Sequence, residues 1–216
     1  MKLCALYLVQ CCQIVLCIEI RLFPNHPTVT CKHKMTQYTY ISSIDYISNL
    51  TFDYVETYSF QRGTEFEESY KTSRPEYEKL KVRKDKRNDL TVLEEKRFLE
   101  LQDLFGSTQY LLNDKGQFHP SSTKTNTFKS TDPQIDRLKN ILRTEIKDIP
   151  AWMCAPMYRD AIVFYDKLNR IVSILNVCLS CEYMETKMFN HINGDNKTYD
   201  LLRQYFIDLG HKIEDR

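Results

Sequence analysis

The arrangement of apolar and polar residues is most regular in the last third of the chain. Two apolar runs rich in β-branched and aromatic residues, Ala161 to Tyr165 and Ile171 to Val177, flank a polar segment at 166–170. Asp and Asn in such a segment hydrogen-bond their own backbone, and strand-forming residues on both sides are typical of a β-hairpin. The segment holds no Gly, so we expect Asn169 to adopt a positive φ. The pattern predicts a central β-hairpin over 161–177.

Three stretches with helical spacing of apolar residues lie on either side of this hairpin. The first opens with a capping box, Thr91 with Glu94. The second has Asp132 as its N-cap and Pro133 as its first helical residue, and the third has Thr198 as its expected cap. Their expected ends are marked by Gly106, Pro150 and Gly210. Their apolar faces are Phe98, Leu101, Leu104 and Phe105, then Ile135, Leu138, Leu142 and Ile146, and finally Leu201, Leu202, Tyr205, Phe206 and Leu209.

Two strands are expected before the first helix, at Tyr38 to Ile47 and at Leu50 to Phe60. In the second, apolar residues recur at alternate positions, which is more typical of a packed sheet face than of a base-stacking platform. The segment 61–88 is first acidic and then basic, and we expect it to be a solvated strand or loop. The polar segment 113–130 shows no periodicity and is expected to be a flexible loop.

These elements together favour one fold class. Helices before and after the hairpin need an apolar surface to cover, and a sheet supplies one. We therefore expect an α+β fold, in which an antiparallel sheet is built around the hairpin at 161–177 and helices pack on one face. With 216 residues the chain is long enough for a single domain with a sizeable core, which we place at 21–216 after a hydrophobic segment at 1–20.

The hydrophobic segment at 1–20 contains an apolar run over 3–18 that is interrupted only by two Gln residues. A run of this length fits the apolar core of a signal peptide better than a membrane span, which needs about 20 residues. The segment has no cleavage site of small residues. A signal peptide or an anchor predicts an exported or membrane-associated protein, with contact to the membrane through residues 3–18. The alternative is a buried N-terminal strand or helix in a cytoplasmic protein.

Composition and motifs point away from most enzyme classes. The formal net charge of +1 and the absence of a nucleic-acid module around the basic half of 61–88 predict no nucleic-acid partner. The sequence contains no GxGxxG, GxxxxGK[ST], HExxH or GxSxG motif, and with 5 Gly a glycine-rich phosphate loop is hard to build. We therefore assign no catalytic residue and expect a protein that is not an enzyme.

Cysteines are the sharpest feature of the sequence. Of 8 in the chain, Cys154 precedes the hairpin, while Cys178 and Cys181 form a C-x-x-C pair after it. Three interpretations are open: small buried thiols, a disulfide that an exported chain favours, or a zinc site formed by the three cysteines, with His191 as a further ligand. In an extended strand Cys178 and Cys181 lie ~10 Å apart, so a disulfide here either pairs Cys154 with one of them or needs a turn at 179–180. Zinc is the only cofactor that the sequence suggests.

Nine residues around the hairpin match a pattern that recurs in other proteins. They are Cys154, Arg159, Ala161, Ile162, Phe164, Tyr165, Asp166, Cys178 and Cys181. With these residues the segment from 149 to 181 resembles a family of short, uncharacterised bacterial proteins found among flavobacteria and their relatives. Asp160 stands where that family has a histidine, and Leu179 where it has an aromatic residue. The resemblance implies that the three cysteines act as a unit, and it names no reaction.

Three functional hypotheses follow. The first is a non-catalytic α+β protein, exported or associated with the envelope, whose cysteines are structural. The second is a zinc- or thiol-dependent cytoplasmic protein that uses Cys154, Cys178 and Cys181. The third is a partner-binding protein of the immunity type, which would use the charged segment from Glu65 to Arg87 and the tyrosine-rich strands as its exposed face.

Overall fold

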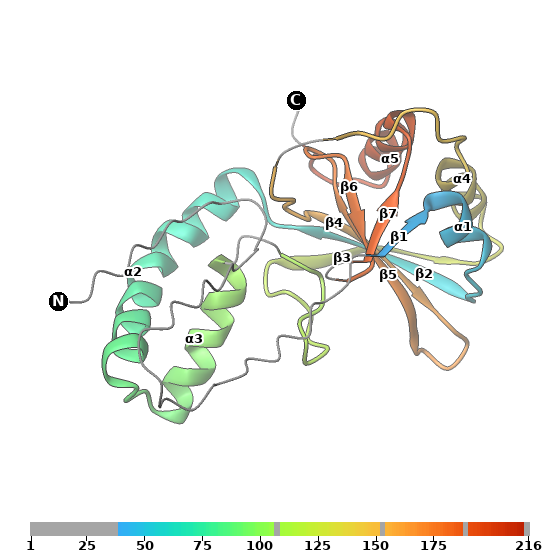
Figure 1. Cartoon of the computed structure of the whole chain (residues 1–216). Coiled ribbons are helices and arrows are strands. Elements are labelled where there is room, and N and C mark those ends of the chain that lie inside the picture. Colours follow the sequence, from blue (N-terminus) through green and yellow to red (C-terminus); the bar gives the residue numbers. More distant parts are fainter. Residues whose placement is uncertain (1–38, 106–108, 152–153, 188–189, 214–216) are drawn as a thin grey trace, which may run out of the picture. The chain divides into compact units, whose positions relative to one another are not determined.

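The computed structural model describes residues 39–105, 109–151, 154–187 and 190–213, which belong to one compact unit, Tyr38–Arg216. The predicted segment at 1–20 and the expected helix end at Gly106 lie outside the described residues. The described residues form seven strands and five helices (Figure 1). In chain order these are β1 (Thr39–Ser42), α1 (Ser43–Ser48), β2 (Tyr54–Phe60), α2 (Gly63–Arg87), α3 (Val92–Phe105), β3 (Ser122–Lys129), α4 (Pro133–Leu142), β4 (Asp160–Tyr165), β5 (Ile171–Cys178), β6 (Tyr183–Glu185), β7 (Asn190–Asn193) and α5 (Asn196–Asp208).

The strands form one sheet in the order β1-β7-β6-β5-β4-β2-β3. Neighbouring strands are antiparallel except β1 and β7, which are parallel. β4 lies between β5 and β2, and all six of its residues are buried, because both of its edges and both of its faces are covered. The predicted α+β class is confirmed, and the sheet around the 161–177 hairpin is mostly antiparallel.

The turn between β4 and β5 has the conformation that its sequence predicts. Asn169 has a φ of 61°, which confirms it as the residue with positive φ. The carboxylate of Asp166 accepts hydrogen bonds from the backbone nitrogens of Leu168 and Arg170, at 2.8 and 3.0 Å. An Asp that satisfies its own turn in this way replaces the glycine on which many hairpins depend.

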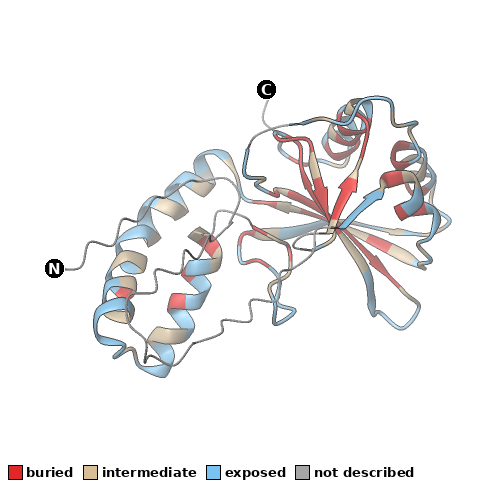
Figure 2. Cartoon of the chain, viewed as in Figure 1, coloured by how far each residue is buried: buried red, intermediate tan, exposed pale blue. Residues whose placement is uncertain are grey.

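Three helices cover one face of the sheet. Apolar side chains of α1, α4 and α5 pack in one cluster with alternate residues of the strands, such as Ile162, Phe164 and Leu175. Figure 2 shows buried residues along the central strands and on the sides of α4 and α5 that face them. Each fully buried Leu, Ile or Phe of this cluster contributes roughly 1.5–3 kcal/mol relative to an exposed one. The expectation that helices pack on one face therefore holds for these three.

Helices α2 and α3 pack against each other in a cluster of their own, with Leu80, Phe98, Leu101 and Leu104 buried. The expectation of a strand or loop at 61–88 was wrong, because most of this segment is the 25-residue helix α2. Its charges are spaced so that they pair one helical turn apart, which stabilises a solvated helix. These pairs are Lys71 with Glu67, Arg74 with Glu78, and Lys81 with Asp85.

The capping box of α3 is confirmed. The backbone nitrogen of Thr91 donates to Glu94 Oε2 at 2.9 Å, and the backbone nitrogen of Glu94 donates to Thr91 Oγ1 at 3.3 Å. Asp132 likewise caps α4 by accepting from the backbone nitrogen of Gln134 at 2.9 Å. For α5 the expected cap was wrong: the N-cap is Asp195, and Thr198 is buried in the first turn. Both residue types cap helices, so sequence alone does not separate them.

Two further expectations needed correction. The segment from Tyr38 to Ile47 is not one strand, because Ser42 ends β1 and caps α1 by accepting from the backbone nitrogen of Asp45 at 2.9 Å. The supposed flexible loop at 113–130 contains β3, an edge strand whose exposed positions are Thr and Lys. An edge strand that faces water carries little hydrophobic periodicity, so its sequence looks like a loop.

None of the helices in the described ranges has the length and apolar character that a membrane crossing requires.

Candidate functional site

The end of the central hairpin holds a pair of cysteines at disulfide distance, Cys154 and Cys181. Their Cα atoms lie 6.4 Å apart, within the usual range for a disulfide, and they are 27 residues apart in the sequence. Cys154 is exposed in the loop before β4, whereas Cys181 is buried in the turn after β5. The bond therefore ties the two open ends of the hairpin together and closes it into a covalent loop.

The third cysteine of the predicted unit, Cys178, is a fully buried free thiol at the end of β5. It packs in one cluster with Cys181 and Tyr158, and the rings of Tyr110 and Tyr183 lie against them. We call these five residues with Cys154 the cysteine–tyrosine cluster. Cys178 and Cys181 belong to one cluster because residues 179–182 form the turn between β5 and β6, in which Glu182 has a φ of 52°. The structure thus brings the three predicted cysteines to one end of the hairpin.

A buried carboxylic acid lies next to this cluster. Glu185, on β6, is 3% exposed and accepts a hydrogen bond from the hydroxyl of Tyr110. Across the described residues, no Lys, Arg or His lies at ion-pair distance from it. The pKa of Tyr158 is raised above its ordinary value, first by burial and then by the charge of Glu185. Its hydroxyl finds no hydrogen-bond partner in the described parts of the chain.

His191 lies on β7, opposite Glu185 in the strand register. Its ring centre is 4.0 Å from that of Tyr183 and 5.7 Å from that of Tyr40. Burial lowers the pKa of His191 to about 4, so the ring is neutral at neutral pH. Its Nδ1 is buried and finds no hydrogen-bond partner in the described parts of the chain.

The predicted zinc site conflicts with the disulfide for a chemical reason. Zinc binds thiolates, and a disulfide leaves Cys154 and Cys181 without them. Within the described ranges, no group of three His, Cys, Asp or Glu residues is placed to hold a metal ion. Zinc at Cys154, Cys178 and Cys181 thus stays a prediction that concerns the reduced chain alone.

A second polar cluster lies under the helix-covered face and was not foreseen. Oδ1 of Asp160 accepts from Arg62 Nη2 and from His211 Nδ1, each at 2.7 Å, and all three side chains are buried. Nε2 of His211 lies 2.8 Å from Oγ1 of Thr125, which in turn is 2.7 Å from Oγ1 of Thr57. This chain of contacts ties the segment after α5 to β4, β2 and β3. With every buried charge paired, it is best explained as a structural network.

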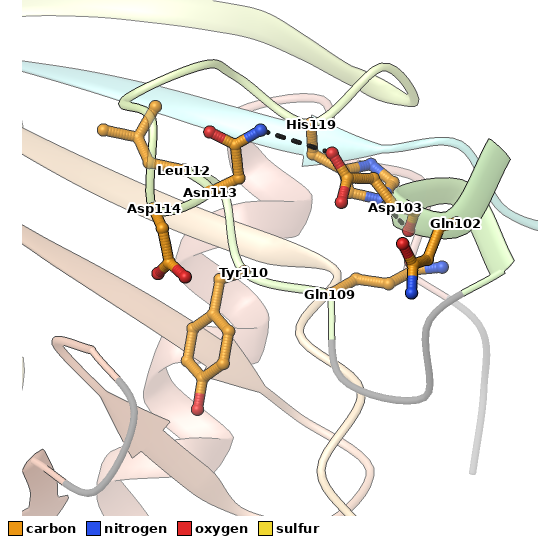
Figure 3. A pocket seen from close by; sticks show the side chains of 8 residues that line it. All are labelled: Gln102, Asp103, Gln109, Tyr110, Leu112, Asn113, Asp114 and His119. Carbon is orange, nitrogen blue, oxygen red and sulfur yellow. Dashed lines mark hydrogen bonds between the residues drawn. The ribbon is translucent and has the colours of Figure 1, made fainter. Parts of the chain in front are cut away.

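A small pocket of about 180 Å³ lies beside the end of α3. Most of the side chains that line it are polar (Figure 3). His119 donates from Nε2 to the carbonyl of Asp103 at 2.9 Å, and its Nδ1 accepts from the backbone nitrogen of Ser121 at 3.2 Å. Burial lowers the pKa of His119, which agrees with this neutral tautomer. Both ring nitrogens therefore serve the fold. Asp114 and Tyr110 lie apart from Asp103 and His119 in this view, so the acidic groups do not converge on one point.

Sequence reasoning found the cysteines but missed the side chains around them. Tyr110 lies 44 positions before Cys154 in a segment without periodicity, so nothing local links the two. Glu185 and Tyr158 flank the cysteines closely in sequence. Glu185 directly follows the buried Met184 in a short strand, and successive side chains of a strand point to opposite faces of the sheet. This was the one signal that a carboxyl group faces the other side of the sheet.

Comparison with protein-family models, with curated proteins and with solved structures finds no match for this chain. The resemblance to the flavobacterial family therefore stays a prediction. The fold and the site define an α+β protein whose central hairpin has a disulfide pair at its open end.

Proposed function

We propose that this protein is a non-catalytic, exported or envelope-associated α+β protein in which the Cys154–Cys181 disulfide is structural. The observation that carries the proposal is the position of this pair at the two open ends of the hairpin. Disulfides persist in oxidising compartments and are rare in the cytoplasm of most organisms. The hydrophobic segment at 1–20 supports the same location.

Peptide mapping of the full chain, purified from its native compartment and alkylated at once, tests this proposal. We expect the tryptic peptide 148–159 to be crosslinked to peptide 171–187 in the native protein, and the crosslink to disappear after reduction. An alkylated Cys154 and an alkylated Cys181 in freshly isolated native protein would overturn it. Zinc analysis of the same sample tests the alternative, since bound zinc with three free thiols supports the metal site at Cys154, Cys178 and Cys181.

One observation favours the second candidate, a partner-binding protein. Val92 and Leu93, in the first turn of α3, are 87% and 80% exposed. Two adjacent apolar side chains in water on a helical hairpin suit a contact with another protein. The basic end of the charged segment from Glu65 to Arg87 would flank that contact, since Arg83 and Lys84 pair with Glu94 and Glu95 in the first turn of α3.

The test of this candidate compares one double and one single surface variant in chemical crosslinking of the full chain inside its own cells. We expect Val92→Asp with Leu93→Asp to lose a crosslinked partner that the native chain retains. Leu168→Asp is the matched control, because Leu168 is also exposed, at 61%, but lies in the hairpin turn. Partners that both variants retain would count against a role for this helix.

A further inference from the structure

The cysteine–tyrosine cluster places a free thiol beside a disulfide. Cys178 and Cys181 share the buried neighbour Tyr158, and the four-residue turn at 179–182 folds one cysteine back toward the other. The extended geometry that would hold the two sulfurs ~10 Å apart is therefore absent here. Glu182 takes a positive φ in this turn although it has a side chain, a conformation that residues other than Gly adopt infrequently. The turn thus keeps both cysteines in one cluster of side chains, in a backbone conformation that the local sequence does not favour.

The two partners in the disulfide differ in exposure. Cys154 is exposed, Cys181 is 8% exposed and Cys178 is fully buried. Cys178 is therefore shielded from reagents in solution. The group with which its thiolate can react is the neighbouring disulfide. The hydroxyl of Ser180 lies 3.4 Å from Sγ of Cys178, where it can donate a hydrogen bond to a thiolate.

We propose that Cys154, Cys178 and Cys181 form a thiol–disulfide exchange site. The thiolate of Cys178 attacks Sγ of Cys181, so the Cys178–Cys181 bond forms and the Cys154–Cys181 bond breaks. The electron pair leaves on Sγ of Cys154, and the proton that Cys178 released passes to the solvent, so Cys154 is left as a thiolate. The reaction needs no oxidant or reductant, because one disulfide replaces another.

The direction of this exchange follows from solvation. Cys154 is the leaving sulfur, and its exposure allows water to stabilise the departing thiolate. The exchange converts an exposed disulfide sulfur into an exposed nucleophile, and it leaves the two buried cysteines bonded to each other. The free Cys154 thiolate can then attack a disulfide of a protein or a small molecule, forming a mixed disulfide at Cys154 and releasing one thiolate of the target.

This inference rests on the disulfide that also carries the proposed function, but it goes beyond a structural role. The probe is 5,5′-dithiobis(2-nitrobenzoate), an aromatic disulfide that releases a coloured thiolate when a protein thiol attacks it. The full native chain is treated with the probe, quenched in acid and mapped by peptide. We expect the label on Cys154 in peptide 148–159, and an internal disulfide between Cys178 and Cys181 in peptide 171–187 of the same molecules.

The matched variants are Cys178→Ser and Ser180→Ala. Without the Cys178 thiol the Cys154–Cys181 bond cannot be exchanged, so labelling of Cys154 should be lost, whereas loss of the Ser180 hydroxyl should slow it several-fold. If Cys178→Ser does not fold, the native chain still tests the exchange, because the label on Cys154 and the Cys178–Cys181 disulfide must occur in the same molecules. A native chain that keeps Cys154–Cys181 and never carries the label on Cys154 overturns the exchange and leaves the structural disulfide standing. A chain in which Cys154 and Cys181 are never paired overturns both.

Discussion

At the scale of single residues, burial changes protonation most on the sheet face that α1, α4 and α5 do not cover. His191 is 5% exposed and lies between two tyrosine rings. Aromatic rings supply no counter-charge of the kind that a carboxylate gives, so burial decides its protonation state. Such a residue makes the stability of the whole fold depend on pH.

Acid should destabilise the protein through His191. Its pKa is about 4 in the native state and about 6.5 when unfolded, so between these values the unfolded chain binds a proton that the native chain does not. Stability is therefore full above pH 6.5 and falls by roughly 3 kcal/mol as the pH drops to 4. Urea unfolding between pH 4 and pH 7.5 measures this slope.

The matched variant for this measurement is His191→Phe, which keeps an aromatic ring and removes the titrating group. We expect its stability to vary less with pH over the same window. The remaining slope should reflect His119, whose pKa is also lowered by burial, and carboxylates such as Asp166 and Asp195, whose pKa is lowered by backbone hydrogen bonds. Equal slopes for the variant and the native chain would show that His191 does not set the acid sensitivity.

Sequence analysis at the scale of residues succeeded where a rule is local. Asn169 was assigned a positive φ because it stands in a short turn without glycine, and Asp132 was assigned as a cap because Pro133 follows it. Asp160 could not be understood in this way. Its partners Arg62 and His211 lie far away along the chain, and only the folded sheet brings them within 2.7 Å.

Among the elements, the β4–β5 hairpin is the one whose sequence and structure agree most closely. Its apolar runs, its polar turn and its strand pairing could all be predicted from the sequence, because a two-stranded hairpin depends on residues that are close together along the chain. β3 could not be predicted, since an exposed edge strand made mostly of Ser, Thr, Lys and Asn has the composition of a loop. α2 was misassigned because it has few apolar residues, and the contact with α3 that gives it a buried side becomes visible only in the structure.

The turn of this hairpin can be tested by changing Asn169 alone. Asn169→Gly should keep the native stability within about 0.5 kcal/mol, because Gly adopts a positive φ readily. Asn169→Val should lower the free energy of unfolding by roughly 1–2 kcal/mol, because its branched side chain is strained in the left-handed region. Urea denaturation of the two variants against the native chain gives the comparison, and equal stabilities for Gly and Val would contradict the assigned turn.

At the scale of the whole molecule, the disulfide restricts the unfolded chain as well as the folded one. Closing a loop between residues 27 positions apart removes conformational entropy from the unfolded state. We expect reduction to lower the free energy of unfolding by roughly 3–4 kcal/mol. The variant Cys154→Ala with Cys181→Ala should match the reduced native chain, and it should not respond to reductant through these two positions. A stability that is the same with and without reductant would show that the bond does not form.

The position of this bond also governs how the protein responds to mechanical load. Tension applied between the two termini passes from Cys154 directly to Cys181, so β4, β5 and the turn between them bear none of it. Pulled to full extension, the oxidised chain should end roughly 90 Å shorter than the reduced one, since 27 residue steps stay out of the stretched path. The strand pair at the centre of the sheet is thereby protected from unravelling when the chain is pulled at its ends.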